Sequence, residues 1–327
     1  MKKIAIFLSV MTLFLIGPTG YEAEGASRTP HIGILIPESG QSETQTVKGL
    51  RDGLKELGYR EGNNIILEVR NARGYRGGLK SMAVELVSKK IDLIFTTGSG
   101  ATEAAKAATT EIPIVFRHPL NPVTLGFVKS MTRPGLNMTG VAGLSVQKAE
   151  RRLKILKEIF PPLRRVLIFY DTYNPISQGH FAIAERAATK LGLEVLEQPI
   201  RTGKDLMIAL NRFKKRQGDA FYHVSDDLVE NEAESIFKVA RQKKLPTMFG
   251  RVAWAARGSL TAYGPNYYEM GRQAASLIDK ILKGARPENL PIELAKKFDL
   301  FINLRTANII GVAVPPEVLK RADRVIR

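Results

Sequence analysis

The sequence predicts an α/β protein built from two doubly wound lobes, each with a parallel sheet that helices cover on both faces. Short β-rich apolar runs alternate with segments of helical period, which is typical of parallel βαβ units. The first four runs recur, strand for strand, at an offset of roughly 130 residues, which indicates a duplicated layout. The chain has 327 residues, 44% hydrophobic and 25% charged, typical of a globular protein of about two domains.

Eight apolar runs predict the strands of the two sheets. They are residues 32–36, 65–69, 91–96 and 112–116 in the first half, and 166–170, 193–196, 220–224 and 246–249 in the second. Helices are predicted between them from apolar residues that recur every three or four positions, such as Val47, Leu50, Leu54 and Leu57. A last unit follows, with strands at 260–263 and 300–303 around a helix at 266–283.

No stretch rich in Pro, Gly or Ser separates the halves. The crossing near Gly140 to Gly143 is short, which favours a hinge, and the last unit is expected to return to each lobe in turn. We predict a first lobe of residues 31–143 plus 257–288 and a second lobe of residues 144–256 plus 289–327. Open α/β sheets bind ligands beyond the carboxyl ends of their strands, so two hinged lobes predict a cleft that closes around a ligand.

The first 25 residues have the pattern of a signal peptide. Two lysines follow Met1, residues 4–16 are apolar, and Ala23 and Gly25 supply small residues for a cleavage site. The apolar run is shorter than the ~20 residues needed to span a bilayer. The alternative is an uncleaved anchor, because the cleavage site is imperfect. We predict export to the periplasm or another extracytoplasmic compartment.

The charge and the missing cysteines exclude several classes of protein. The sequence contains no cysteine, which excludes disulfides, thiol catalysis, Cys-ligated zinc and a lipid anchor on an N-terminal cysteine. The formal net charge is +17, which suits an anionic membrane surface or nucleic acid, and export argues against nucleic acid. The charge can instead reflect a generally basic proteome. We interpret the basic runs at 151–152, 164–165 and 214–216 as solvated.

Polar residues follow the predicted strands of the first lobe. Glycines and hydroxyl groups at a strand-to-helix turn let a ligand approach the backbone, and the helix N-terminus favours an anion or carboxylate. Ordinary helix capping is the alternative, and nucleotide binding is disfavoured because Gly98 and Gly100 form only a fragment of the dinucleotide motif. The candidate ligand-binding residues of this lobe are Glu38, Ser39, Thr97, Ser99, Ala101, Thr102, His118 and Asn121.

The second half of the chain supplies five more candidates: Tyr173, Asn174, Asp226, Arg251 and Asn266. Asp226 suits a ligand ammonium or caps a helix predicted over residues 228–243. Arg251 suits a ligand carboxylate or is a solvated surface residue. These alternatives remain open at the level of sequence.

No catalytic or metal-binding motif is present. The sequence has no nucleophile elbow, zinc-protease motif, Walker A loop or EF-hand spacing, and its four histidines lack metal-ligand spacing. No Ser or Asp spacing around His118 indicates a catalytic triad. We therefore expect a protein that is not an enzyme and uses no metal or cofactor.

Three groups of motifs together carry a family resemblance. They are Pro122-Val123 with Gly126-Phe127-Val128 and the run 133–141, then residues 278–287 with 290–293, and finally the C-terminal segment 298–327. The chain resembles ABC transporter substrate-binding proteins of the TrpX/YtrF-like family. The resemblance implies a type I periplasmic-binding fold, with two Rossmann-like lobes and three hinge crossings. It also implies a monomer that captures an aromatic amino acid or a related aromatic or carboxylate compound, with an ABC permease and its ATPase subunit as partners.

Three positions depart from the family pattern. Asn121 and Asn266 stand where relatives often have Asp, and Arg251 stands where amino-acid-binding members tend to have an acid. These changes favour an anion or a neutral aromatic compound over an α-amino acid. The alternatives are an exported ligand sensor with a membrane signalling partner, an exported hydrolase, and a LacI-type repressor core. A repressor needs an N-terminal helix-turn-helix where this chain has a signal-peptide pattern.

Overall fold

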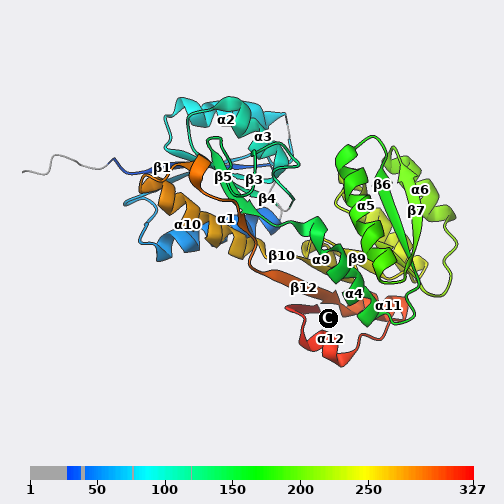
Figure 1. The fold of residues 1–327 in the computed structure, drawn as a ribbon. Helices are drawn as coiled ribbons and strands as arrows, with labels where there is room; N and C mark the ends of the chain where they lie inside the picture. The colour runs from blue at the N-terminus through cyan, green and yellow to red at the C-terminus, as the bar shows by residue number, and fades with distance from the viewer. Residues whose placement is uncertain (1–27, 38–40, 76, 119) are drawn as a thin grey trace, which may run out of the picture.

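The computed structural model describes residues 28–37, 41–75, 77–118 and 120–327, which form two α/β lobes (Figure 1). The predicted signal peptide lies outside the described residues. The first half comprises β1 (His31–Ile36), α1 (Gln41–Glu56), β2 (Ile66–Asn71), α2 (Gly78–Ser88), β3 (Leu93–Thr97), α3 (Gly98–Ala108), β4 (Ile114–His118) and β5 (Met138–Ala142). No helix within the described residues has the length and apolar character to cross a membrane.

The rest of the chain is also mixed helix and strand. It comprises α4 (Ala149–Ile159), β6 (Arg165–Asp171), α5 (Pro175–Lys190), β7 (Glu194–Ile200), α6 (Gly203–Arg212), β8 (Asp219–Tyr222), α7 (Asp227–Asn231), α8 (Ala233–Gln242), β9 (Thr247–Phe249), α9 (Ala253–Arg257), β10 (Thr261–Pro265), α10 (Tyr267–Leu282), β11 (Glu293–Leu294), β12 (Phe298–Asn303), α11 (Leu304–Ile310), α12 (Pro316–Lys320) and β13 (Arg324–Ile326). Short 3₁₀ turns lie at Ser145–Lys148 and Pro287–Asn289.

The two sheets confirm the predicted doubly wound α/β class. The first has six parallel strands in the order β11-β5-β4-β3-β1-β2. The second has the order β13-β12-β10-β9-β8-β6-β7, with one antiparallel pair, β10 and β12. β1, β3, β4 and β5 are almost entirely buried, as expected for parallel strands with helices on both faces.

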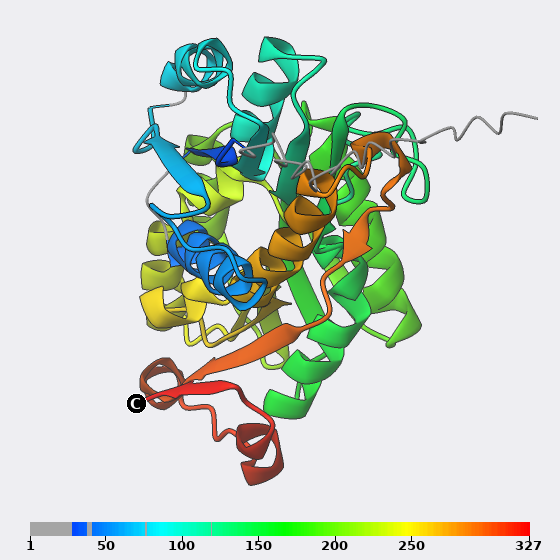
Figure 2. The same cartoon turned by 90° about the vertical axis from the view of Figure 1, so that its left-hand side faces the viewer.

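The chain passes between the described lobes after β5, after β10 and after β11; Figure 2 follows the last of these passages from orange β11 to β12. This arrangement differs from the predicted boundaries at two places. Residues 257–288 were assigned to the first lobe, but β10 pairs with β9 in the second sheet. Residues 289–327 were assigned to the second lobe, but β11 pairs with β5 in the first. Hydropathy shows that a strand exists but not which sheet it joins.

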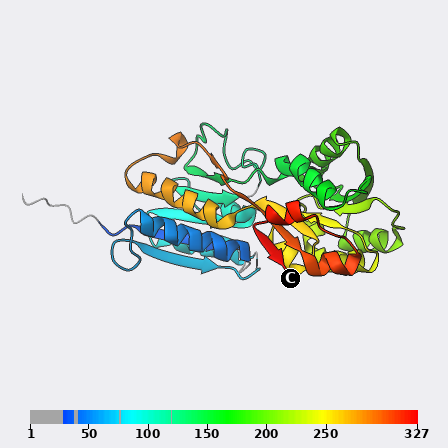
Figure 3. The same ribbon diagram turned by 90° about the horizontal axis from the view of Figure 1, so that it is seen from below.

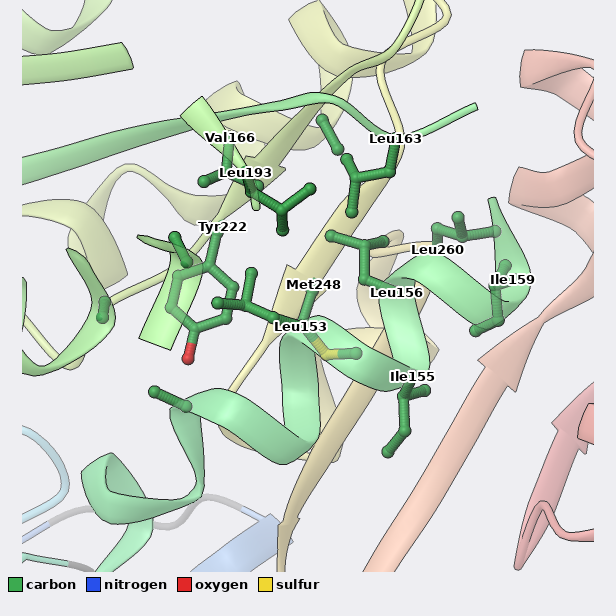
Figure 4. Packing of buried hydrophobic residues seen from close by; sticks show 14 of the residues in the cluster. Leu153, Ile155, Leu156, Ile159, Leu163, Val166, Leu193, Tyr222, Met248 and Leu260 are labelled. Atoms are coloured by element: carbon green, nitrogen blue, oxygen red, sulfur yellow. The ribbon is translucent and has the colours of Figure 1, made fainter. Parts of the chain in front are cut away.

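Each sheet has an apolar core on both of its faces. In the second lobe, α4 and α5 cover one face through a cluster that includes Leu153, Leu156, Val166 and Tyr222 (Figure 4). α6 to α9 cover the other face. In the first lobe, α1 and α10 cover one face and α2 and α3 the other. Fully burying one such side chain stabilises the folded state by about 1.5–3 kcal/mol. The two cores therefore fix the positions of the strand ends in each lobe.

Helix α10 belongs to the first lobe although it follows β10 of the second. It lies against α1 (Figure 3), and glycines bring the two backbones together. A Cβ on Gly49 would lie 1.9 Å from the Tyr268 carbonyl oxygen, and one on Gly271 would lie 2.1 Å from that of Thr46. Any larger residue at either position would force the helices apart.

Candidate functional site

The candidate site lies where parallel strands of the two sheets end. In the first lobe β3 and β4 end at Thr97 and His118, and in the second β6 and β9 end at Asp171 and Phe249. These edges face each other, since the guanidinium of Arg251 in the second lobe is one of the charges that lower the pKa of His118 in the first. Strand ends of open α/β sheets are the usual place for a ligand.

A hollow of about 230 Å³ lies between the lobes beside their connections. The first lobe lines it with Gln45, Tyr267 and Tyr268, and the second lobe with Val252, Phe301 and neighbouring residues. Asn266, at the crossing after β10, is part of the same wall. Because both lobes line this hollow, its size depends on the angle between the lobes.

The first-lobe edge contains a serine–histidine pair. Ser99 stands in the first turn of α3, and its Oγ lies 2.7 Å from Nε2 of His118, the last residue of β4. The turn before Ser99 requires Gly98, which adopts a φ of +74°. Because β3 and β4 are neighbours in the sheet, two residues 19 positions apart meet at one edge.

The hydrogen bonds of His118 fix its tautomer. The backbone N–H of Leu120 donates to Nδ1 at 3.0 Å, so Nδ1 carries no hydrogen. Burial, followed by the charge of Arg117, lowers the pKa of His118 to about 3, so the ring is neutral near pH 7. The ring hydrogen is then on Nε2, which donates to Ser99 Oγ. The Ser99 hydroxyl is left with its own hydrogen to donate.

The other described first-lobe candidates are buried or form hydrogen bonds within their own lobe. Thr102 Oγ1 donates to the Gly98 carbonyl at 2.7 Å and lies 2.9 Å from Thr96 Oγ1. Ala101 is fully buried in the core, and Thr97 is also fully buried, its hydroxyl without a partner among the described residues. Asn121 accepts from the Val123 N–H at 2.9 Å and closes the loop after β4.

Glu38 and Ser39 were also predicted at this edge. Both lie outside the described residues.

Asp226 has two partners within the second lobe. Its carboxylate accepts from the Val229 N–H at 3.1 Å, capping α7, and from the Asp171 N–H at 3.3 Å. The helix predicted over 228–243 is two helices, because Glu232 interrupts it between α7 and α8. Asp226 is 5% exposed, and it caps α7 as the sequence allowed. The neighbouring Asp171 supplies a second carboxylate at this edge.

The remaining second-lobe candidates are spread along the same edge. Asn174 caps α5 by accepting from the N–H groups of Ile176 and Ser177. Tyr173 is 70% exposed, with the Arg201 guanidinium 5.1 Å from its ring centre. Asn266 caps α10 and donates to Asp299 Oδ2 at 2.8 Å.

Arg251 forms an ion pair with Glu230 at 3.3 Å, and its side chain is 29% exposed. It is therefore neither fully solvated nor enclosed. A partly exposed guanidinium next to the opposite lobe has the geometry to reach a ligand carboxylate.

Sequence reasoning missed His223, which follows β8 and is buried. Its ring stacks on Phe249 with centroids 4.6 Å apart, and neither ring nitrogen has a hydrogen-bond partner among the described residues. Burial, then the charges of Arg152 and Arg251, hold the pKa of His223 well below its usual value. The signal was weak, because His223 lies inside the predicted strand 220–224, and only the structure shows that β8 ends at Tyr222.

Arg152 corrects a prediction. We expected it to be solvated, but it is 3% exposed. Its guanidinium donates to the carbonyls of Tyr263 (2.7 Å) and Gly250 (3.3 Å) and to Ser145 Oγ. The physical reason is that α4 starts directly after the first crossing, so its inner face meets the ends of β9 and β10. Arg151, on the outer face, is exposed as expected.

No group of three or more acidic or histidine side chains among the described residues is arranged to hold a metal ion. Direct interactions at both edges are hydrogen bonds and ion pairs between protein groups.

The family of ABC transporter substrate binding proteins matches residues 31–326. This chain belongs to that family. The match confirms the resemblance predicted from the motifs. Family membership implies a small-molecule ligand, a permease partner and an extracytoplasmic location.

Individual relatives agree with the family. The tyrosine-binding protein of Clostridioides difficile is 28% identical over 288 residues, covering 88% of this chain and 82% of that protein. A conserved domain protein from Vibrio cholerae has a TM-score of 0.79 at 28% identity, covering 91% and 100% of the two chains. The ligand-free, open structure of a substrate binding protein with adhesive properties from Clostridium difficile has a TM-score of 0.76 at 26% identity, covering 91% and 99%.

Proposed function

We propose that this protein is the solute-binding component of an ABC import system and captures an aromatic amino acid, or a related aromatic carboxylate, by closing its lobes. The observation that supports a carboxylate ligand is the Ser99–His118 pair at the start of α3. His118 makes Ser99 a hydrogen donor toward the space between the lobes, beside the positive end of a helix dipole. Arg251 on the opposite edge adds a second carboxylate partner.

The second-lobe edge also holds acidic groups that could pair with the ammonium group of an amino acid. Asp171 and Asp226 lie together at the ends of β6 and β8, on the same edge as Arg251. A ligand with a carboxylate toward Ser99 and Arg251 and an ammonium toward the two acids would match both groups. The tyrosine-binding relative supports this amino-acid alternative. If Asp171 and Asp226 serve only to hold the protein backbone, no group is left for an ammonium, and the ligand is the deaminated aromatic acid.

Closure is supported by the connections between the lobes. The crossings after β5, β10 and β11 are single segments, and the hollow they border has walls from both lobes. Rotation at such segments is the common way in which two-lobed binding proteins enclose a ligand. Ligand that first binds the donor edge of the first lobe would then meet Arg251 on closing.

The serine–histidine pair is not proposed as a catalytic dyad. A general base must accept the serine proton, and His118 Nε2 already carries a hydrogen. Protonation of the ring at Nδ1 is opposed by its low pKa. We therefore propose binding without chemical change of the ligand.

Calorimetric titration tests this proposal. The panel is L-tyrosine, L-tryptophan and L-phenylalanine with their deaminated aryl-acetate counterparts, and we expect at least one compound to bind and to reduce the radius of gyration measured by X-ray scattering. Ser99→Ala is expected to weaken that binding by about 1.5–3 kcal/mol, since it removes a hydrogen bond to a charged group. Ser88→Ala is the matched control, because Ser88 is an exposed serine at the far end of α2. Turnover of a panel compound without any change in scattering would exclude the proposed function.

A further inference from the structure

The second lobe carries a concentration of positive charge at the edge of its sheet where strands begin. Three connections meet there: the residues before β6, those between α6 and β8, and those between α8 and β9. The Arg164 N–H donates to the Gly218 carbonyl at 2.8 Å, and Lys243 Nζ donates to the Phe213 carbonyl at 2.8 Å, which holds the three connections together. We call the following residues the basic pole: Arg164, Arg212, Lys214, Lys215, Arg216, Lys243 and Lys244.

The cations of the basic pole have no acidic partners among the described residues. Two acids are near it: Asp219 is fully buried and bound bidentately by Arg165 at 2.7 and 2.8 Å, and Glu194 lies next to Arg165. None of the seven cations forms an ion pair with any residue the structure describes. In the first lobe, by contrast, cations such as Lys48, Arg70 and Lys89 each pair with a carboxylate. Seven positive charges without an ion pair to any described residue therefore lie together at one edge of the second sheet.

Helix termini explain only part of this pattern. Arg212 and Lys243 stand at the ends of α6 and α8, where a helix dipole favours positive charge. Residues 214–216 follow the C-cap of α6 in the connection to β8, and Lys214 and Arg216 are exposed. No ion pair among the described residues accounts for their charge.

We propose that the basic pole binds the anionic headgroups of a phospholipid membrane. Clusters of four to eight Lys and Arg are attracted to anionic leaflets without a defined pocket. Nucleic-acid bases stack on exposed aromatic rings, whereas the aromatic residues of the three connections, Phe160 and Phe213, are both half-buried. A substrate-binding protein of an ABC transporter also works next to a membrane, where its permease resides.

The position of the pole is compatible with ligand binding. β6 to β10 are parallel, so the strand starts lie at the opposite edge of the sheet from the strand ends that form the candidate site. A molecule bound to a membrane through its basic pole therefore leaves the candidate site accessible to a ligand. The attraction would confine the protein near the membrane and raise its rate of encounter with the permease.

Co-sedimentation of the exported chain with phospholipid vesicles tests the proposal. We expect binding to vesicles of equal phosphatidylglycerol and phosphatidylcholine in about 0.02 M salt, loss of that binding at about 0.3 M salt, and none with phosphatidylcholine alone. The triple variant K214Q/K215Q/R216Q is expected to lower the partition coefficient by about tenfold or more. Its ligand affinity and unfolding midpoint should match those of the natural chain.

The matched control is K55Q/R60Q/K80Q, which removes the same charge from exposed positions of the first lobe. This control should bind vesicles nearly as well as the natural chain. An equal loss in both triple variants would mean that only net charge matters and would overturn the assignment to the pole. Absence of binding to anionic vesicles, or tighter binding to single-stranded DNA than to vesicles at the same salt concentration, would overturn the membrane as partner.

Discussion

The two strand-end edges that face each other between the lobes are built from different kinds of groups. The first-lobe edge presents a neutral histidine, a serine hydroxyl and a helix N-terminus. The second-lobe edge presents full charges that already have protein partners, with Arg251 paired to Glu230 and Asp226 capping α7. A ligand meets ready donors on the first edge and must compete with internal partners on the second. We therefore expect the first lobe to bind first and the second to set selectivity on closure.

The largest expected effect is the loss of stability at acidic pH, which tests whether His118 on the first edge is neutral. His118 has a pKa of about 3 when folded, against ~6.5 in an unfolded chain, so protons favour the unfolded state. Stability is then complete above pH ~6.5 and falls as the pH drops toward 3, by about 3 kcal/mol at pH 4 from this group alone. His223, also buried and with a lowered pKa, adds to the loss in the same direction.

Urea unfolding at pH 7 and pH 4 measures this dependence. His118→Gln is expected to be less stable than the natural chain at pH 7 but to lose less stability on acidification. An identical pH dependence in the two proteins would show that His118 is not buried as a neutral ring.

An effect of similar size, on ligand binding instead of stability, is expected from Arg251 on the second edge. Arg251→Gln should weaken the binding of an aromatic carboxylate by about 2–4 kcal/mol, because it removes a charged partner from an enclosed ligand. Arg186→Gln, an exposed arginine on the outer helix α5, is the control. Equal titration curves for the two variants would remove Arg251 from the site.

The smallest effect is expected at Asp226, where two substitutions distinguish a helix cap from a partner for a ligand ammonium. Asp226→Ala should lower the free energy of unfolding by about 1 kcal/mol through loss of the α7 cap, whereas Asp226→Asn should preserve it, since asparagine caps equally well. If Asp226 also holds an ammonium, Asp226→Asn weakens binding of L-tyrosine by about 1 kcal/mol and leaves the deaminated acid unaffected. Unchanged binding of both compounds would restrict Asp226 to its structural role.

The fold was largely predictable because its strands are local apolar runs. The eight predicted strands of the two halves all form, with ends shifted by a few residues. β5 was missed because Met138–Ala142 is short and contains Gly140, so it looked like a hinge; its partner β4 makes it a strand. The lobe to which β10 belongs was also missed, since strand pairing is a contact distant in sequence.

The site was predictable as a set of positions but not as a set of interactions. Ser99 and His118 were each expected at a strand end, but their hydrogen bond depends on the neighbouring places of β3 and β4 in the sheet. Burial decided the other cases. Arg151 and Arg152 look alike in sequence, and only the packing of α4 against β9 and β10 separates the solvated one from the buried one.

The contact between α1 and α10 sets the order in which the protein can be completed during synthesis. The first lobe needs α10 and β11, which the ribosome makes only after every residue from α4 to β10 has emerged. Until then the apolar surface that α1 and its sheet bury against α10 stays exposed, and this core cannot be completed. The chain therefore stays incompletely folded for most of its translation.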